Sequence, residues 1–327
     1  MELPKLTDLE VTGKRILLRL DLDCDPDPND LRIKASTETL DYLKEKGAKI
    51  IIIAHRGRPS HEATAGKSSI DEKLSLLPFQ SIFDKWGATV EENLRFDPGE
   101  EANDPEFAKK LASQGEAFIN EAFASSHREH ASIVGLPKLL PHAAGFRFVK
   151  EVENLSKVLD NPKHPVVFLL SGVKEDKLSY LEGIKKFADK ILVGGRLPDY
   201  MGDEKLISVR SRNEDEQVIV GNLTMDKEDI TLNTIDRFSS EIKKAGTIVV
   251  SGPMGKYEDE GHRQGTERVF KVVAESSVFK VAGGGDTESA IRLLSLADKF
   301  SWISVGGGAM LDFLVNGTLP GITALES

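Results

Sequence analysis

The residues best suited to chemistry lie in four short turns in the second half of the chain. Each turn follows an apolar run and is rich in glycine or polar residues. The turns are LLSGVKEDK (169–177), VVSGPMGKYE (249–258), VAGGGDT (281–287) and ISVGGGAM (303–310). Glycine lets a phosphate approach the backbone, and a helix that begins there offers unpaired N–H groups and a positive dipole end. One such turn is also typical of a tight strand-to-helix connection, but four together favour a nucleotide polyphosphate site.

Asp286 directly follows the glycines of the third turn. Because Mg²⁺ prefers oxygen ligands and keeps part of its water shell, Asp286 together with phosphate oxygens predicts a magnesium site. Two other phosphate motifs fail. HEATAGKS (61–68) approaches the P-loop pattern, but His61 replaces the first glycine and the stretch lies in a polar loop, and no G-x-G-x-x-G follows the first predicted strand.

Basic residues follow several predicted strands in the first half. They are Arg32, Arg58, Arg95, Arg128, His55, His127 and His130. Guanidinium groups match carboxylate and phosphate in bidentate fashion, so these residues would bind a small, multiply charged acid if they converge on one cleft. Taken singly, each arginine is more typical of a surface ion pair and each histidine of a structural role. Spacing alone does not decide between the two interpretations.

Composition narrows the classes of function. The chain has 43 Lys and Arg against 53 Asp and Glu, a formal charge of -10, which argues against broad attraction to nucleic acid or an anionic membrane. Cys24 is the only cysteine, which fits a reducing compartment. The first residues have no signal-peptide pattern, and nowhere do 18 apolar residues run together. We therefore expect a cytoplasmic protein.

Short apolar runs alternate with stretches of helical periodicity, and this pattern predicts the fold class. The runs lie at 15–22, 48–55, 164–172, 190–195, 246–252, 277–285 and 300–308, and the helical stretches include 36–47, 177–190, 266–276 and 287–299. Continuous apolar strands joined by helices indicate an α/β chain whose parallel sheets are covered on both faces. A length of 327 residues allows two domains. A helix followed by a proline-containing turn at 150–165 favours a boundary near 145–165.

Nine ordered blocks of the sequence resemble those of the phosphoglycerate kinases. The blocks are RLDLD, LRI, HRGRP, ENLRFDPGEEANDPEFAKKLAS, NEAFASSHREHAS, AGF, GPMGKYE, GGGDT and SVGGGA, and the similarity extends from residue 13 to residue 325. The resemblance implies two doubly wound, Rossmann-like parallel-sheet domains joined by a helical hinge. Residues 1–148, with the tail 314–327 returning to them, would bind phosphoglycerate. Residues 149–313 would bind the nucleotide.

The resemblance also implies the reaction. Phosphoglycerate kinases transfer a phosphoryl group reversibly between 1,3-bisphosphoglycerate and ADP, giving 3-phosphoglycerate and ATP, with Mg²⁺ on the nucleotide. Closure of the two domains would bring the substrates into line and exclude water. The implied partners are therefore small molecules, with neither nucleic acid nor membrane among them. A cytoplasmic monomer is the expected state.

The family's motifs assign roles to particular positions. The substrate-binding set implied by the resemblance is Asp21, Leu22, Asp23, Arg32, His55, Arg56, Gly57, Arg58, Arg95 and Arg128. The nucleotide-binding set is Lys174, Lys177, Glu258, Gly284, Gly285, Asp286 and Thr287, with Asp286 on the metal. The catalytic set is Arg32, Lys174, Gly307 and Gly308. A loose phosphoryl transition state needs positioning and charge stabilisation rather than a strong base, which suits an arginine facing the transferred group.

The sequence also departs from the family. Asp23 stands where the family has an asparagine, and Lys174 and Lys177 are three positions apart where the family has four. The segments around 194–196 and 229–234 lack family residues that line the adenosine pocket, so we expect base specificity to be affected more than phosphate binding. Two alternatives stay open: a phosphotransferase with another nucleotide or acid, and a binder without catalysis. The retained Arg32, Lys174 and Asp286 argue against the second.

Overall fold

The computed structural model describes residues 2–59, 72–201 and 217–327. The chain divides into two compact units, Met1–Val152 with Thr318–Ser327, and Glu153–Gly317. The division falls within helix α7 (Phe146–Leu159), which contributes residues to both units. The P-loop-like stretch 61–68 lies outside the described residues. In the part of the chain that the structure describes, no helix is long and apolar enough to span a membrane.

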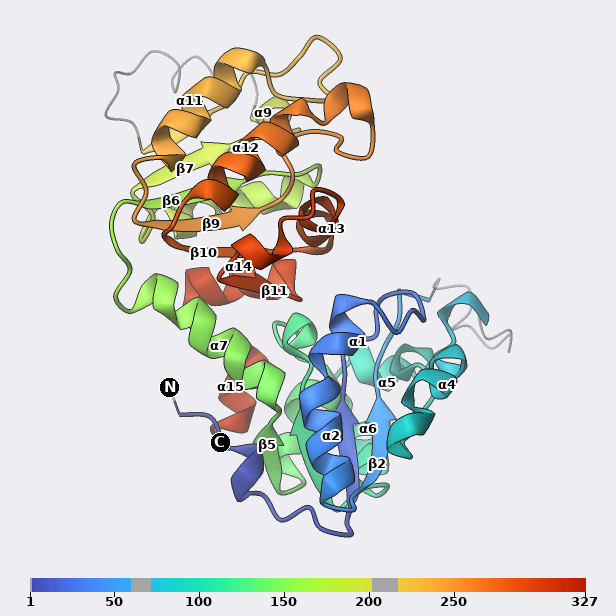
Figure 1. Cartoon of the computed structure of the whole chain (residues 1–327). Coiled ribbons are helices and arrows are strands. Elements are labelled where there is room, and N and C mark those ends of the chain that lie inside the picture. Colours follow the sequence, from blue (N-terminus) through green and yellow to red (C-terminus); the bar gives the residue numbers. More distant parts are fainter. Residues whose placement is uncertain (1, 60–71, 202–216) are drawn as a thin grey trace. The chain divides into compact units, whose positions relative to one another are not determined.

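The first unit is built on a five-stranded parallel sheet (Figure 1). The strands are β1 (Arg15–Arg19), β2 (Lys49–Ile53), β3 (Thr89–Val90), β4 (Ala117–Asn120) and β5 (His142–Ala144), in the order β3-β2-β1-β4-β5. The helices are α1 (Leu31–Ala35), α2 (Thr37–Glu45), α4 (Gln80–Phe83), α5 (Pro98–Glu101), α6 (Pro105–Ala112) and α15 (Pro320–Leu325). The winding direction reverses between β1 and β4, so the carboxyl ends of these two strands form the expected ligand crevice.

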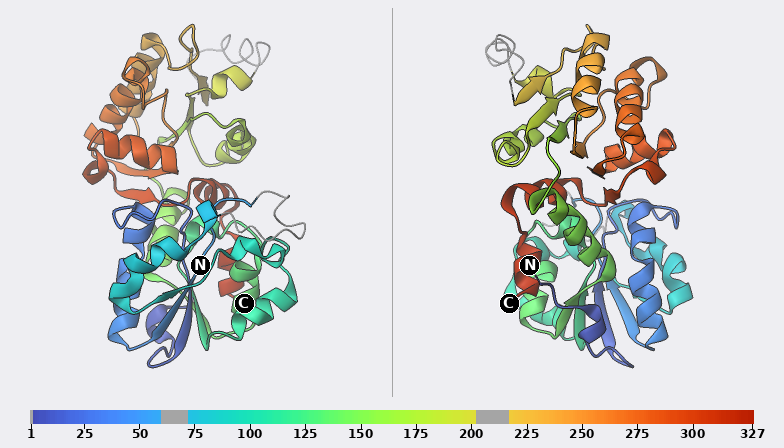
Figure 2. Two further views of the ribbon diagram at one scale, coloured as in Figure 1. Left: turned by 90° about the vertical axis from the view of Figure 1, so that its right-hand side faces the viewer. Right: turned by 60° about the vertical axis from the view of Figure 1, so that its left-hand side comes forward.

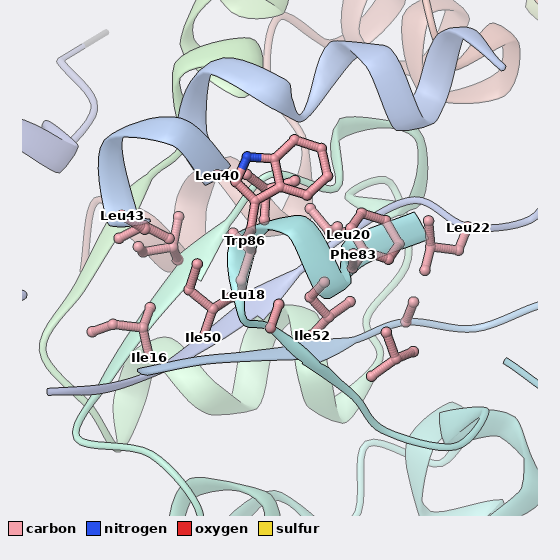
Figure 3. Close-up of a cluster of buried hydrophobic side chains, with 14 of the residues drawn as sticks. Ile16, Leu18, Leu20, Leu22, Leu40, Leu43, Ile50, Ile52, Phe83 and Trp86 are labelled. Carbon is pink, nitrogen blue, oxygen red and sulfur yellow. The ribbon is translucent and has the colours of Figure 1, made fainter. Parts of the chain in front are cut away.

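Alternating residues of β1 enter different cores, because successive strand side chains point to opposite faces of a sheet. Ile16 and Leu18 join the cluster drawn in Figure 3, where Phe83 and Trp86 also pack. Leu17 joins a second cluster with Phe118, which includes residues of α6. Both faces of the sheet are therefore buried, which explains the continuous apolar run in the sequence.

The second unit has a six-stranded parallel sheet in the order β11-β10-β9-β6-β7-β8. The strands are β6 (Val166–Leu170), β7 (Lys190–Val193), β8 (Val218–Val220), β9 (Thr247–Ser251), β10 (Phe279–Gly283) and β11 (Trp302–Ser304). The helices are α8 (Leu181–Ile184), α9 (Leu197–Tyr200), α11 (Leu232–Ile242), α12 (Gln264–Glu275), α13 (Gly285–Leu293) and α14 (Gly307–Asn316). Figure 2 shows helices on both faces of each sheet. The switch point here lies between β6 and β9.

The prediction of two doubly wound parallel sheets is confirmed. The predicted helical stretch at 177–190 is helical as far as Ile184 but does not form one continuous α-helix. A 3₁₀ segment, Glu175–Tyr180, leads into the single turn of α8, and the bonds Lys186 N–H to Gly183 and Phe187 N–H to Ile184 are of the tighter 3₁₀ type. A Cβ at Gly183 would lie 2.3 Å from a methyl group of Val315, so the close packing of this segment requires glycine, a poor helix former.

Glu121 fixes the start of α7 to the end of β4. Its buried carboxylate accepts hydrogen bonds from the Thr39 hydroxyl (2.5 Å) and from the backbone N–H groups of Arg147 (3.2 Å) and Phe148 (3.0 Å). Burial raises the pKa of Glu121 to about 7, although these hydrogen bonds and the Arg147 charge favour the ionised form. The carboxylate satisfies donors at the helix N-terminus that would otherwise be orphaned.

We expect Glu121 to make the free energy of unfolding fall as pH rises from about 4.5 to about 7. Its folded pKa lies above the ordinary value of 4.5, so over this range the folded state binds more protons than the unfolded state, and stability decreases with pH. The shift corresponds to at most roughly 3 kcal/mol. Urea unfolding at several pH values should give a flatter profile for Glu121→Gln than for the wild type. Glu45→Gln, at an exposed position of α2, is the control, and an equally steep profile in both variants would contradict the assignment.

Candidate functional site

Hydrogen bonds to Asp21 connect the two sides of the crevice between β1 and β4. Its carboxylate accepts from the Ala124 N–H (2.8 Å) and the Ser125 hydroxyl (2.5 Å), which joins the loop after β1 to the loop after β4. Leu22 is fully buried in the hydrophobic core, so its side chain is not available to a ligand. Asp23 accepts a hydrogen bond from the Gly57 N–H at 2.7 Å. These bonds bring together predicted substrate residues of the loops after β1 and β2 and join them to the loop after β4.

The loop after β2 carries four of the predicted substrate residues, and they are held differently. Arg56 forms an ion pair with Asp25 at 2.7 Å, so its charge is already balanced. The Gly57 carbonyl accepts from Arg95 at 2.6 Å, and its φ of +59° favours glycine. Arg58 is exposed. The fourth residue, His55, is buried, and the charge of Arg95 acts on it.

Three arginines concentrate positive charge beside this loop. Burial and then the neighbouring Arg128 lower the pKa of Arg95 to about 10, with a smaller contribution from Arg58, while Glu101, 2.8 Å away, opposes the effect. Arg128 buries its Nη1 group without a hydrogen-bond partner among the described residues. An unpaired buried N–H is costly, so this cluster suits an anion that would accept from it.

Sequence reasoning missed the buried network beneath the arginines. Arg19 is fully buried and donates to Ser132 at 2.8 Å, while Ser132 donates to Glu100 at 2.6 Å. Glu100 lies 3.9 Å from Arg19 and 3.6 Å from His130. A charged residue inside an apolar strand was the available signal, because an arginine is almost never fully buried unless paired.

This network fixes the form of His55. Arg19 Nη2 lies 2.6 Å from His55 Nδ1. A guanidinium has only donors, so Nδ1 accepts and the imidazole proton sits on Nε2. Burial, followed by the charges of Arg19 and other nearby cations, holds the pKa of His55 well below its usual value. His55 is therefore a neutral N–H donor.

Arg32 lies beside the substrate residues. Asp30 caps helix α1 by accepting from the Arg32 N–H at 2.8 Å. The Arg32 guanidinium donates from Nη1 to the backbone carbonyl of Asp23. This contact places a cation of α1 against the loop after β1.

In the second unit, Lys177 lies across the switch point. Its ammonium group donates to the carbonyls of Ser171 (2.8 Å) and Ser251 (3.3 Å), at the carboxyl ends of β6 and β9. Burial lowers the pKa of Lys177 to about 8, which the Asp286 charge opposes and the Lys174 charge reinforces. Lys174 itself is exposed at the start of the 3₁₀ segment. The shorter lysine spacing therefore still directs Lys177 toward the strand ends.

The two glycine turns pack directly against each other. A Cβ at Gly307 would lie only 2.6 Å from the Cα of Gly284, which has a φ of +109°. Around Gly285 a Cβ would meet nothing within 4 Å, and Gly308 is exposed in the first turn of α14. The Thr287 hydroxyl accepts from the Gly252 N–H (2.8 Å) and donates to the Gly283 carbonyl (2.9 Å). Thr287 thus braces neighbouring turns from within.

A pocket of about 490 Å³ opens over these strand ends. Its walls include Gly172, Val173, Gly195, Arg196, Glu228, Pro253, Gly255, Lys256, Tyr257, Glu258 and Asp286. Asp286 is exposed and forms no hydrogen bond or ion pair with any described residue. One free carboxylate fits Mg²⁺, which proteins commonly bind through one or two carboxylates plus substrate phosphates. No group of three or more metal-ligating side chains occurs within residues 2–59, 72–201 and 217–327.

Comparison with known proteins agrees with this arrangement. The family model described as "Phosphoglycerate kinase" matches residues 6–228 and 203–317. The phosphoglycerate kinases of Coprothermobacter proteolyticus and Dictyoglomus turgidum are each 33% identical to this chain, with 99% and 98% of both proteins covered, respectively. Solved phosphoglycerate kinases from Coxiella burnetii and Pyrococcus horikoshii superpose with TM-scores of 0.81 and 0.79, at 27% and 26% identity, and cover 99% and 98% of the chain.

The first doubly wound unit has a cationic crevice, and the second has a pocket beside glycine turns. This combination is typical of a phosphotransferase. The family match covers well over half of the chain, and relatives above 30% identity extend over nearly all of it. The chain belongs to the phosphoglycerate kinase family. It is an enzyme of the phosphotransferase class whose acceptor is a carboxyl group.

Proposed function

We propose that the chain transfers a phosphoryl group reversibly between 1,3-bisphosphoglycerate and ADP, with its own residues in the roles set out below. The observation that carries the proposal is the arginine cluster of the first unit. Arg128 buries an N–H group there that has no partner in the described part of the chain, near a neutral His55 and a buried Arg95. Such a site suits the phosphate of a small phosphorylated acid.

The loop after β1 would bind the end of the substrate that carries its carboxylate and hydroxyl groups. Asp21 and Asp23 are tied to the loops after β4 and β2, so they hold a fixed position for a hydroxyl group. His55 donates from Nε2 because its Nδ1 already accepts from Arg19. Arg32, held on the Asp23 carbonyl, is placed to stabilise charge on the group in transfer.

The second unit would bind the nucleotide phosphates. Lys177 lies over the ends of β6 and β9, and Lys174 adds a second, exposed charge. The N–H groups that begin α13 and α14 point from the glycine turns, as phosphate sites at helix N-termini require. Asp286 is the residue that would hold Mg²⁺. The chemistry that the ion supplies when bound is neutralisation of charge on the phosphate oxygens.

The transfer step needs no acid or base. In the direction of ATP use, a carboxylate oxygen of 3-phosphoglycerate forms a bond to the γ-phosphorus while the bond from that phosphorus to the β–γ bridging oxygen breaks. ADP leaves with the bonding electron pair. Arg32, Lys174 and the N–H groups of Gly307 and Gly308 stabilise the charge spread over the moving phosphoryl oxygens.

The proposal includes a cytoplasmic monomer. Cys24, the only cysteine, is partly buried, and burial raises the pKa of its thiol to about 12, which suits a protein that keeps a free thiol in a reducing compartment. Each of the two candidate sites is composed of residues of one unit of one chain. These observations support the proposal and leave its tests to solution measurements.

The test is a coupled assay with magnesium, 3-phosphoglycerate and ATP. We expect turnover on the scale of ordinary enzymes, about 1–1,000 per second. Calorimetric titration with 3-phosphoglycerate provides the parallel binding measurement. If the protein binds 3-phosphoglycerate but shows no turnover with each nucleoside triphosphate tested, a binder without catalysis is favoured. That result would overturn the proposal.

A further inference from the structure

We infer that Glu228 and Lys256 bind the edge of the nucleobase, so that this chain accepts guanine nucleotides at least as well as adenine nucleotides. The inference rests on the proposed nucleotide function of the pocket. It concerns the end of the pocket that lies away from Asp286.

The order of the strands gives the pocket its direction. Asp286 follows β10, whereas Arg196 follows β7, and both residues line the pocket. From β10 to β7 the sheet crosses three strand spacings, by way of β9 and β6, which is about 14 Å. Phosphates held near Asp286 and Lys177 therefore leave the base toward β7 and β8. Glu228 follows β8, and the Lys256 N–H donates to the Glu228 carbonyl, so both residues line the pocket on this side.

Glu228 and Lys256 are joined through both backbone and side chain. The Lys256 N–H donates to the Glu228 carbonyl at 2.8 Å, and the Lys256 ammonium lies 3.8 Å from the Glu228 carboxylate. The Lys256 side chain is 55% exposed and the Glu228 side chain is 32% exposed. At this separation and exposure, both groups retain hydrogen-bonding capacity for a ligand.

A buried carboxylate holds the Glu228 segment in place. Asp229 accepts from the Ile230 N–H at 2.8 Å and from the Gly265 N–H at 2.9 Å. A Cβ at Gly255 would lie 2.3 Å from the Asp229 carboxylate, so the turn that carries Lys256 packs directly on Asp229. The two charged side chains are therefore presented from a braced backbone, which reduces the entropy lost on binding.

The chemistry of this pair matches guanine. Guanine presents two adjacent donors, N1–H and the N2 amino group, beside the O6 acceptor. A carboxylate can accept from both donors while an ammonium donates to O6. Adenine presents one amino donor beside the N1 lone pair, which would face the second carboxylate oxygen. A site that pairs a substrate's hydrogen-bonding groups discriminates strongly against an analogue lacking them.

The test compares the binding of Mg²⁺-GDP, Mg²⁺-IDP and Mg²⁺-ADP by calorimetry, which is independent of turnover. We expect GDP to bind at least as tightly as ADP, and IDP, which lacks only the N2 amino group, to bind about tenfold more weakly than GDP. Glu228→Gln should weaken GDP binding about tenfold or more and change ADP binding less than threefold. The retained ADP binding shows that the variant is folded.

Lys256→Met is a second test variant. Like Glu228→Gln, it should weaken GDP binding more than ADP binding. Glu182→Gln is the control, because Glu182 is an exposed carboxylate of the same unit that pairs with Lys185 outside the pocket lining. ADP binding tighter than GDP binding, or equal losses for both nucleotides in Glu228→Gln, would overturn the inference. Either result leaves the proposed kinase function standing. That function fails separately, if the coupled assay shows no turnover.

Discussion

Arg32→Ala is expected to lower kcat by about 1,000-fold while changing the affinity for 3-phosphoglycerate less than tenfold. Arginines that face a transferred phosphoryl group contribute on the order of 1,000-fold or more to its rate. Arg32 is held on the Asp23 carbonyl, whereas Arg58 and Arg128 act on the charge of Arg95 beside the loop after β2. Steady-state kinetics with calorimetric binding of 3-phosphoglycerate measures both quantities.

The control for this prediction is Lys34→Ala, which removes an exposed cation from the same helix α1. Its kcat should stay within about twofold of the wild type, because an exposed surface charge has little local effect. Loss of 3-phosphoglycerate affinity in Arg32→Ala, with an unchanged rate in the saturated complex, would assign Arg32 to substrate binding instead of transfer.

Asp286→Ala is expected to lower kcat/KM for the magnesium nucleotide by about 100-fold, a typical loss when one preorganised electrostatic partner is removed. Asp286 is an exposed carboxylate in the pocket wall, without a protein hydrogen bond or ion pair within the described ranges. Removing it should therefore leave the fold intact. Activity titrated with Mg²⁺ at fixed nucleotide should require a higher metal concentration in the variant.

Glu288→Gln is the matched control for Asp286. Glu288 lies two residues further along α13 and pairs with Arg292 at 2.8 Å, outside the pocket lining. Its magnesium titration should superpose on that of the wild type. An Asp286→Ala enzyme with an unchanged titration would show that the metal ion does not depend on this carboxylate.

The fold could be predicted from the sequence because its signals are local. The apolar runs that become β1, β2, β6, β9 and β10 are continuous, and each is followed by turn residues. The departure from a continuous helix at 177–190, by contrast, has a cause that is not local in the sequence. Periodicity there favours a helix, but Gly183 packs against Val315, a contact between residues 132 positions apart that no short window contains.

The residue types of the candidate site could be predicted from the sequence. The buried hydrogen-bond network that holds them in place could not. The resemblance named Asp23, Gly57 and Arg95, and the structure brings these three together; their roles remain predictions. The network of Arg19, Ser132 and Glu100 could not be predicted by spacing, because its partners lie on three separate segments. Its effect on His55, which is to fix the position of one proton, depends on a 2.6 Å contact that sequence does not encode locally.

The contact between Gly284 and Gly307 has a mechanical consequence. A Cβ at position 307 would lie only 2.6 Å from the Gly284 Cα, so the two turns are in contact through their backbones with no side chain between them. Thr287, bonded to Gly252 and Gly283, extends this coupling to a third turn. We therefore expect a ligand that orders the turn carrying Asp286 also to restrict the turn at the start of α14.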